Sequence, residues 1–425
     1  MSTDQPDLAR RLGTTDAVVI GLSAMIGAGV FAAFAPAAAA AGSGLLIGLV
    51  IAGGVAYCNA SSSAALAARY PRSGGTYVYG RERLGEWWGF MAGWGFVVGK
   101  TASCAAMALT FASYVTPGLA RPLAVAAVVV FTAVNYFGVT KTAGLARVLL
   151  AVTLVALAVI LVAMFGGGRL AADHLGAQLW TGGGVVGTLQ AAGLLFFAFA
   201  GYARIATLGE EVRDPVRTIP RAVRTALAVV LVLYAVVAVG LLLVLDPAEL
   251  AASTAPLRDA VEAGSLSWLA PAASVGAAVA SLGALLALIT GVGRTTLAMA
   301  RNRDLPGWLS AVHPRYQVPH HAEIAVGVVV CALVLSFDLR GVIGFSSFGV
   351  LVYYAIANAA AFTLRDGEVR LRRWVPVLGL AGCLILAATL PWTSVVAGLA
   401  VFAVGLAGRA AVLARRDRAG GGRSV

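Results

Sequence analysis

Charged side chains are scarce in this sequence of 425 residues. Asp, Glu, Lys and Arg make up 12% of it, hydrophobic residues make up 60%, and the mean hydropathy is +0.88. Soluble domains are about 25% charged, and disordered chains are far poorer in apolar residues than this one. The composition therefore excludes both classes and leaves an integral membrane protein.

Cysteine is almost absent, and no two cysteines are spaced as C-x-x-C. The four are Cys58, Cys104, Cys331 and Cys383, each inside an apolar stretch. This excludes a disulfide-stapled secreted module and predicts small buried thiols. His313, His320 and His321 share one loop, but a metal site there would need a thiol or carboxylate in suitable geometry. We expect neither a metal ion nor a bound cofactor.

The apolar residues gather in twelve runs, each near the roughly 20 residues that cross a bilayer as a helix. Lipid offers no hydrogen bonds to the backbone, so runs of this length are expected to be helices rather than barrel strands. They lie near 17–41, 44–68, 87–115, 121–138, 145–166, 186–209, 223–245, 269–300, 322–337, 341–363, 374–391 and 393–412. The polar stretch 1–16 has no signal-peptide cleavage site, so we expect the first run to be retained.

Positive charge predicts the orientation, because Lys and Arg in short loops stay on the cytoplasmic side. Of the 31 basic residues, 24 fall in the N-terminus, the loops after even-numbered spans, and the C-terminus, 413–425. Four fall on the opposite side, namely Arg121, Arg169, Arg258 and Arg340. We therefore expect both termini in the cytoplasm. The net charge of +12 then reflects topology, and no nucleic-acid partner is expected.

Two spans are expected to be interrupted by glycine. The first carries Gly27 and Gly29 at its middle, and the sixth carries Gly201 in a comparable place. A glycine inside a helix costs about 1 kcal/mol relative to alanine. The alternative is that these glycines only allow close helix packing, as those of the third span between Gly89 and Gly99 are expected to do.

The spacing of the interruptions predicts an internal repeat. Gly29 and Gly201 are 172 residues apart, which is about five spans, and an odd number of spans inverts the second copy. The expected halves are 17–166 and 186–363, followed by two further spans in 374–412. In such folds the broken helices meet at the bilayer midplane and expose backbone groups, which is a transport architecture.

The residues around the breaks resemble the amino acid–polyamine–organocation (APC) family of permeases. The matching stretches are GLSAMIGAGVF at the first break, ARYPRSGGTYVYGRERLGEWWGFMAGW after the second span, FFAFAGYARIATLGEEVRDPVRTIPRA at the sixth, and GVGRTTLAMARNRDLPGWLSAVHPRYQVPHHA after the eighth. Together they cover spans one to eight. The run E-E-V-x-[DN]-P-x-x-x-I-P, from Glu210 to Pro220, is the most specific of them.

The resemblance implies an all-α membrane protein with the LeuT-like five-plus-five inverted repeat and broken helices one and six. It also implies a small amine or amino acid bound between the two breaks, with the substrate carboxylate on the backbone near Gly27 to Gly29 and its ammonium on carbonyls near Phe199 to Gly201. The substrate-binding residues so implied are Ser23, Ile26, Gly27, Ala28, Gly29, Phe199, Ala200, Gly201 and Tyr202. Aromatic rings at Phe31, Phe199 or Tyr202 would act as thin gates.

The sequence departs from the family pattern in two places. Many members carry an acid two positions after the glycine of the second break, where this chain has Ala203, followed by Arg204. Proton-coupled relatives often carry a lysine in span five, and the corresponding position here is Thr153. Lys100, in span three, is the only lysine at comparable depth.

Three cations lie within predicted spans, namely Lys100, Arg204 and Arg294, while all 19 acids sit at span ends or in loops. A charge in the membrane is costly, so each needs a partner, a cavity or a function. Lys100 either tracks transport through its protonation, since a lysine kept from water can titrate near neutral pH, or pairs with a carbonyl or reaches an interface. Arg204 either pairs with Glu211 or contacts an anion. Arg294 is interpreted as a structural residue on the cytoplasmic side.

Glu210 and Glu211 lie next to Arg213 and Arg217 at the inner end of span six. A gating ion pair and a solvated face both fit this arrangement. The three candidate coupling residues are then Lys100, Thr153 and Arg204, with Phe31, Glu210 and Glu211 as candidate gates.

These features favour a secondary transporter that imports or exchanges amino acids by alternating access. The implied pocket contains no acid, so neutral or small zwitterionic amino acids are favoured, with the proton as coupling ion and sodium as the alternative. Arg outnumbers Lys by 29 to 2, which suggests a GC-rich bacterial genome and a bacterial cytoplasmic membrane. The oligomeric state is not predicted.

Two other readings stay open at this point. One is an antiporter of cationic amino acids or polyamines, which would need an acid such as Glu210 to face the cavity. The other is a membrane nutrient sensor, although such a sensor usually adds a long soluble extension. A membrane enzyme would need a convergent set of His, Asp, Glu or Cys within the spans, which the sequence lacks.

Overall fold

Helices account for nearly all the regular structure of the chain. The computed structural model describes residues 12–70, 74–138, 143–168, 170–176, 183–206, 212–365 and 371–420. Over these residues there is no strand, only an isolated pairing of Leu12 with Val212. The N-terminal half holds α1 (Thr14–Met25), α2 (Ala28–Ala32), α3 (Phe34–Ala41), α4 (Leu45–Arg69), α5 (Thr76–Leu84), α6 (Glu86–Val115), α7 (Ala120–Tyr136), α8 (Ala143–Gly166) and α9 (Asp173–Gly176).

The C-terminal half is also almost entirely helical. It holds α10 (Gly184–Phe199), the 3₁₀ turn η3 (Ala200–Tyr202), α11 (Ala203–Ala206), α12 (Pro215–Val244), α13 (Pro247–Ala252), α14 (Pro256–Glu262), α15 (Ala270–Arg301), α16 (His320–Ser336), α17 (Leu339–Phe362), α18 (Trp374–Thr389) and α19 (Trp392–Gly420). Short 3₁₀ turns also stand at Gly42–Gly44, Pro117–Leu119, Ser267–Leu269 and Gly307–Ser310.

Each predicted span corresponds to helix in the structure. Ten helical segments of the described chain are long and apolar enough to cross a membrane. Two further apolar helices, α16 and α18, stand at the predicted ninth and eleventh spans but have only 17 and 16 residues. The helical class is thus confirmed, whereas the count of twelve crossings and the boundaries of the two repeats stay predictions.

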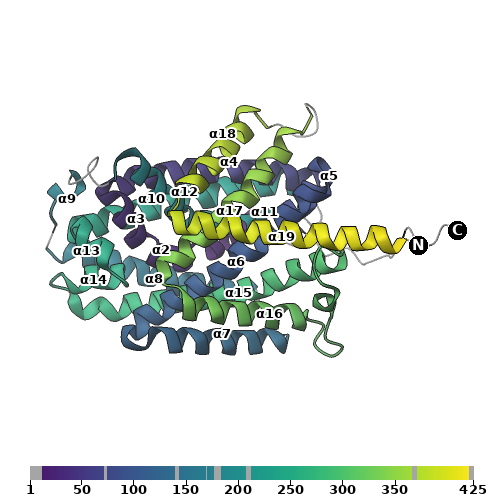
Figure 1. Cartoon of the computed structure of the whole chain (residues 1–425). Helices are drawn as coiled ribbons and strands as arrows, with labels where there is room; N and C mark the ends of the chain where they lie inside the picture. The colour runs from purple at the N-terminus through teal and green to yellow at the C-terminus, as the bar shows by residue number, and fades with distance from the viewer. Residues whose placement is uncertain are drawn as a thin grey trace.

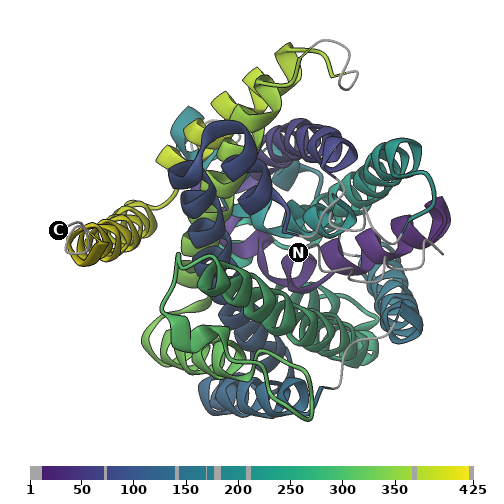
Figure 2. The same ribbon diagram turned by 90° about the vertical axis from the view of Figure 1, so that its right-hand side faces the viewer.

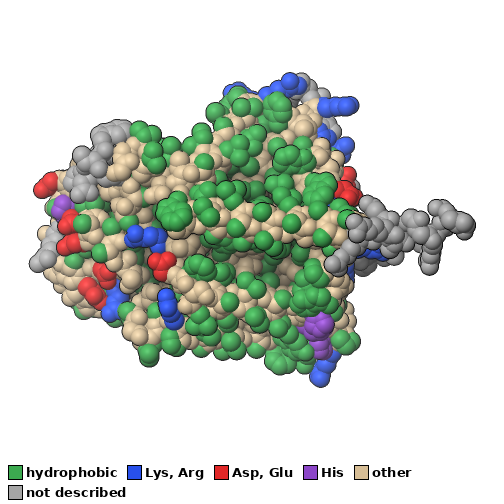
Figure 3. Space-filling model, in the orientation of Figure 1, with side chains coloured by type: hydrophobic (Ala, Val, Ile, Leu, Met, Phe, Trp, Pro, Cys, Tyr) green, Lys and Arg blue, Asp and Glu red, His purple; other side chains and the backbone are tan. Residues whose placement is uncertain are grey.

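Short helices that connect the long ones lie at opposite ends of the bundle. Figure 1 shows α9, α13 and α14 together at one end and α5 with the end of α19 at the other. These are the connections that the charge count assigns to opposite sides of the membrane. Figure 3 agrees, because hydrophobic side chains dominate the middle of the visible face while charged side chains gather toward the two ends.

Glycine permits close packing in the core between α6 and α17. A Cβ atom on Gly349 would lie 2.9 Å from the Cα atom of Gly99, and one on Gly99 would lie 3.1 Å from the Ser346 carbonyl oxygen. Ser103 and Ser346 also share a hydrogen bond of 2.7 Å between their hydroxyls. Small side chains and interhelical hydrogen bonds are what hold helices together in lipid, where apolar burial gives no preference.

A buried ionic cluster fastens the peripheral helix α19, which stands at the edge of the bundle in Figure 2. Asp304, which follows α15, pairs with Arg81 of α5 at 2.9 Å and with Arg409 of α19 at 3.2 Å. The Tyr77 hydroxyl donates to the same carboxylate at 2.7 Å. Burial, together with the hydrogen bond and charge of Asp304, raises the pKa of Tyr77 to about 12, so Tyr77 remains a donor at working pH.

Candidate functional site

The first predicted span is broken at the predicted glycine. Helix α1 ends at Met25, and Ile26 has ψ 71° instead of a helical value. Gly27, with φ −119° and ψ −144°, precedes the short helix α2. The first N–H groups of a helix have no partner within it, so the restart at Ala28 presents backbone donors in the middle of the bundle.

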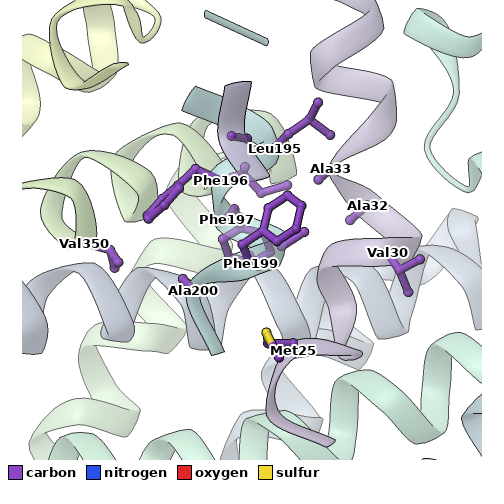
Figure 4. Packing of buried hydrophobic residues seen from close by; sticks show 14 of the residues in the cluster. Met25, Val30, Ala32, Ala33, Leu195, Phe196, Phe197, Phe199, Ala200 and Val350 are labelled. Carbon is purple, nitrogen blue, oxygen red and sulfur yellow. The ribbon is translucent and has the colours of Figure 1, made fainter. Parts of the chain in front are cut away.

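The sixth span is broken as well, over the predicted residues. Helix α10 ends at Phe199, the chain makes a single 3₁₀ turn from Ala200 to Tyr202, and α11 begins at Ala203. A change from α-helical to 3₁₀ geometry alters which carbonyls are used within the helix. Figure 4 shows Phe199 and Ala200 at this break and Met25 at the first one.

The two breaks lie directly against each other through reciprocal glycine contacts. A Cβ atom on Gly29 would lie 2.5 Å from the Cα atom of Ala198. One on Gly201 would lie 2.6 Å from the Met25 nitrogen and would also strike the Ala24 carbonyl. Each break therefore uses a glycine to admit the backbone of the other helix. The sequence left two interpretations of these glycines, a helix interruption or close helix packing. In the structure, Gly29 and Gly201 lie at the breaks and also allow close packing.

Tyr234 of α12 joins the breaks with one hydroxyl. Its oxygen lies 2.7 Å from the Met25 carbonyl oxygen and 3.1 Å from that of Ala198, so the phenol donates to one or the other. The side chain is fully buried and packs its ring on Phe199, with 5.2 Å between centroids. The sequence analysis missed this residue, whose one signal was a lone phenol in an otherwise aliphatic span.

Lys100 reaches the second break from α6. Its Nζ donates to the Ala200 carbonyl oxygen at 3.3 Å, and the Tyr354 hydroxyl of α17 donates to the same oxygen at 3.3 Å. Lys100 is 8% exposed and Tyr354 is fully buried. Among the residues that the structure describes, no carboxylate forms an ion pair with Lys100. Of the alternatives left by the sequence, pairing with a carbonyl is the one seen.

A buried polar network lies behind Tyr202. The Tyr202 and Tyr354 rings are 4.9 Å apart, and the Asn59 amide of α4 lies beside the Tyr202 phenol. Asn358 of α17 donates to the Asn59 side-chain oxygen at 2.6 Å and accepts from the Ser62 hydroxyl at 2.7 Å. The network ties the second break to α4 and α17, so Tyr202 contacts protein on this side.

Phe31, a predicted gate, is covered on the side of α14. Its ring meets Tyr114 of α6 edge to face at 5.7 Å, and its carbonyl oxygen accepts from the Tyr114 hydroxyl at 2.8 Å. The same hydroxyl accepts from the Leu257 N–H, in the first turn of α14, at 3.1 Å. Ser274 of α15 donates to the Tyr114 carbonyl at 2.8 Å. Four helices thus meet over Phe31 on the side of α13 and α14.

The comparisons with known proteins decide the family. The model of the amino acid permease family matches residues 12–407. The chain belongs to this family, within the APC superfamily of LeuT-fold permeases. It is 63% identical over 418 residues to an uncharacterized transporter of Mycobacterium tuberculosis, covering 98% of this chain and 94% of the relative.

Two more distant relatives carry substrate names. The chain is 26% identical over 440 residues to the branched-chain amino acid permease BcaP of Bacillus subtilis, covering 95% of this chain and 93% of the relative. It is 28% identical over 398 residues to cationic amino acid transporter 6 of Arabidopsis thaliana, covering 87% of this chain and 67% of the relative. The expected resemblance to the APC family is confirmed.

Helix α1 and the residues just before it contact neighbouring segments of the permease. Asp16 of α1 forms an ion pair with Arg147 of α8. Gly21 of α1 packs against Ile205 of α11, and the Ser23 hydroxyl turns back to the Ile20 carbonyl of its own helix at 2.9 Å. The Arg213 N–H also donates to the Leu12 carbonyl oxygen at 2.9 Å. The predicted Ser23 is partly exposed and borders the break without donating into it.

The other predicted coupling and gating residues lie in different surroundings. Thr153 of α8 is buried and donates to the Leu149 carbonyl oxygen at 2.8 Å, so its hydroxyl is used within its own helix. Arg204 is exposed on α11. The predicted gating pair Glu210 and Glu211 lies outside the described residues. Of the coupling candidates, Lys100 is the one whose hydrogen bond to a break is described above.

A buried carboxylate on α16 was not singled out from the sequence. Glu323 is 1% exposed, packs flat on Gly293 of α15, and leaves its Oε2 atom without a hydrogen bond among the described residues. The positive charge of Arg294 on α15 lies close enough to interact with the Glu323 carboxylate, which supports the structural role expected for Arg294. Glu323 lies in the first turn of α16, whereas the breaks are on α1, α10 and η3.

Proposed function

We propose that this permease is a secondary transporter that carries amino acids, neutral or small zwitterionic ones above all, across the bacterial cytoplasmic membrane by alternating access. The observation that carries the proposal is the crossing of the two breaks, Gly29 on Ala198 and Gly201 on Met25. Interrupted helices that meet in a bundle offer unpaired N–H groups to a carboxylate and carbonyls to an ammonium, which are the two ends of an amino acid.

The residues of the two breaks take the corresponding roles in this proposal. The backbone from Ile26 to Gly29 binds the carboxylate, and the carbonyls from Phe199 to Gly201 bind the ammonium. Phe31 and Tyr202 border the substrate on either side, with Ser23 and Ala28 at its edge. Glu210 and Glu211 remain proposed inner gates. The two repeats, 17–166 and 186–363, would rock against each other around this fixed site.

The preference for neutral substrates rests on charge. The described residues at the breaks include a cation, Lys100, and no acid that could balance the second positive charge of arginine or putrescine. The branched-chain name of the Bacillus subtilis relative points the same way. The name of the Arabidopsis relative favours the runner-up, a carrier of cationic amino acids.

Proton coupling is proposed over sodium coupling because Lys100 is a titratable group in contact with the break. The 24 to 4 distribution of basic residues supports placing both termini in the cytoplasm.

Transport into proteoliposomes tests the proposal. Purified protein is reconstituted, and uptake of radiolabelled leucine, alanine and serine is measured against protein-free vesicles. We expect saturable uptake that the other two amino acids inhibit and that arginine and putrescine inhibit much more weakly. Uptake dominated by arginine or putrescine would replace this proposal with the cationic one, and absence of uptake for all twenty amino acids would end both.

A further inference from the structure

The carbonyl that the proposed function gives to the substrate ammonium already accepts from an ammonium. The Ala200 oxygen receives the Lys100 Nζ and the Tyr354 hydroxyl, each at 3.3 Å. A carbonyl oxygen has two lone pairs, so two donors satisfy it. Lys100 therefore stands where the amino group of an amino acid is expected to bind.

The neighbouring carbonyls offer no easy substitute. The Met25 and Ala198 oxygens share the single hydrogen of the Tyr234 hydroxyl, and the Met25 oxygen also accepts from the Gly27 N–H at 2.9 Å. The Gly201 oxygen accepts from the Ala203 N–H. An incoming ammonium can gain the Ala200 oxygen only by taking the place of one of its donors. Of the two donors, Lys100 is the one whose charge opposes it.

The surroundings do not compensate two cations. Among described residues, the titratable groups near Lys100 are the Cys104 thiol on its own helix and the Tyr354 phenol, with Tyr202 beside it on η3. Of the charged groups on other elements packed on α6, Arg81 of α5 and Arg409 of α19 pair with Asp304, Glu323 of α16 lies beside Arg294 of α15, and Arg121 of α7 is exposed. Charges of one sign a few ångströms apart repel strongly away from water.

We propose that the proton on Lys100 and the ammonium of the amino acid replace one another at Ala200, so that proton and substrate cross the membrane in opposite directions. The inference rests on the proposed function and adds the sense of its coupling. On binding of the amino acid, the Lys100 ammonium becomes a neutral amine, and its proton passes to water on the side to which the site is open. When the amino acid is released on the opposite side of the membrane, the amine takes up a proton from the water on that side. One site that holds either cation but not both gives exchange instead of symport.

The exchange requires a specific dependence on pH. At low pH Lys100 is protonated and competes with the amino acid, so affinity is low. As pH rises, affinity should increase about tenfold per pH unit and then level off once Lys100 is neutral, since one proton is released per substrate bound. A 2-hydroxy acid analogue has no ammonium and should bind without this dependence.

Calorimetry of the purified full chain tests the proposal, with leucine, alanine and serine as probes and 2-hydroxyisocaproate as the analogue without an amine. Titrations at one pH in buffers of different ionisation enthalpy give the number of protons released. We expect about one proton per leucine and none for the hydroxy acid. In proteoliposomes, an inward-directed proton gradient should drive leucine out of preloaded vesicles.

Two substitutions of Lys100 should act in opposite directions. Lys100→Met has no charge to displace, so leucine should bind at all pH values without proton release. Lys100→Arg keeps its charge, so leucine binding should fall at least tenfold while the hydroxy acid still binds. Arg121→Met, which removes an exposed cation of α7, is the matched control and should behave as the unaltered protein.

The outcomes separate this inference from the proposed function. Leucine binding without proton release, or with proton uptake, would overturn exchange while leaving amino acid transport intact. A pH-dependent affinity that persists in Lys100→Met would place the proton on another group and would likewise overturn it. If no standard amino acid binds, the proposed function fails and the inference with it. Equal loss of leucine and hydroxy acid binding in both variants would mark Lys100 as structural.

Discussion

Gly201 is the residue at which the crossing of the breaks leaves least room. A methyl group there would meet the Met25 nitrogen at 2.6 Å and the backbone of Ala24, which cannot move away as a flexible side chain can. We expect Gly201→Ala to lower the free energy of unfolding by about 1–3 kcal/mol and to abolish uptake. Gly54→Ala, where nothing lies within 4 Å, should change neither. Thermal unfolding in detergent and uptake measure both, and an active Gly201→Ala would show that the helices do not need this approach.

Tyr234 acts at the same scale through a single hydroxyl. In Tyr234→Phe the Met25 and Ala198 carbonyls lose their buried donor, which should cost about 1–3 kcal/mol. Because both carbonyls belong to the breaks, uptake should fall by more than the loss of folded protein explains. Tyr57→Phe, at a 43% exposed position on α4, should leave uptake unchanged. Equal effects of the two substitutions would remove Tyr234 from the site.

Sequence alone could identify the breaks but not what closes around them. Glycine carries its own signal, since it is costly inside a helix, and Gly27, Gly29 and Gly201 were found in this way. Tyr234 and Tyr114 gave no such signal, because a lone phenol in an apolar span has the same sequence appearance whether it binds lipid headgroups or a carbonyl. Their function depends on partners 209 and 83 residues away.

Among the elements, α14 is held to the first broken helix by the Tyr114 hydroxyl. That oxygen donates to the Phe31 carbonyl and accepts from the Leu257 N–H, so α2, α6 and α14 share one atom. We expect Tyr114→Phe to speed hydrogen exchange of the first turn of α14 at least tenfold, since the Leu257 amide loses its acceptor. Mass spectrometry of the deuterated peptide over 255–262 measures this. Protection that is unchanged there would mean that other contacts hold α14.

Helix α19 depends on the ionic cluster around Arg409 and Asp304. Asp304 is 4% exposed in its side chain, as is its partner Arg409. Asp304→Asn removes the buried carboxylate that pairs with both Arg81 and Arg409, and it leaves Arg409 only the exposed Glu86 carboxylate at 3.5 Å. The substitution should therefore destabilise the protein by about 3–5 kcal/mol. Glu262→Gln breaks a partly exposed pair with Arg258 and should cost less than about 1 kcal/mol. Unfolding curves that rank these two in the reverse order would contradict this account of the cluster.

For the whole molecule, the class and the family could be read from composition and motifs, whereas the number of crossings could not. Hydropathy predicts twelve runs, yet α16 and α18 are only 17 and 16 residues long. A helix that is short for the bilayer needs local thinning or tilted neighbours, and nothing in its own residues specifies which. Orientation is different, since it follows from charge counted over all the loops together.

The orientation yields a prediction about the two ends of the bundle seen in Figure 1. The positive-inside distribution places Ser267, exposed between α14 and α15, outside the cell, and Gly307, exposed after α15, inside it. In intact cells, Ser267→Cys should react with a membrane-impermeant maleimide, whereas Gly307→Cys should react only after the cells are opened. The unaltered protein is the control, because three of its four cysteines are buried and Cys331 is partly buried. Labelling in the opposite order would invert the molecule and exchange its inner and outer gates, whereas labelling of both sites from one side would mean that α15 does not cross the membrane.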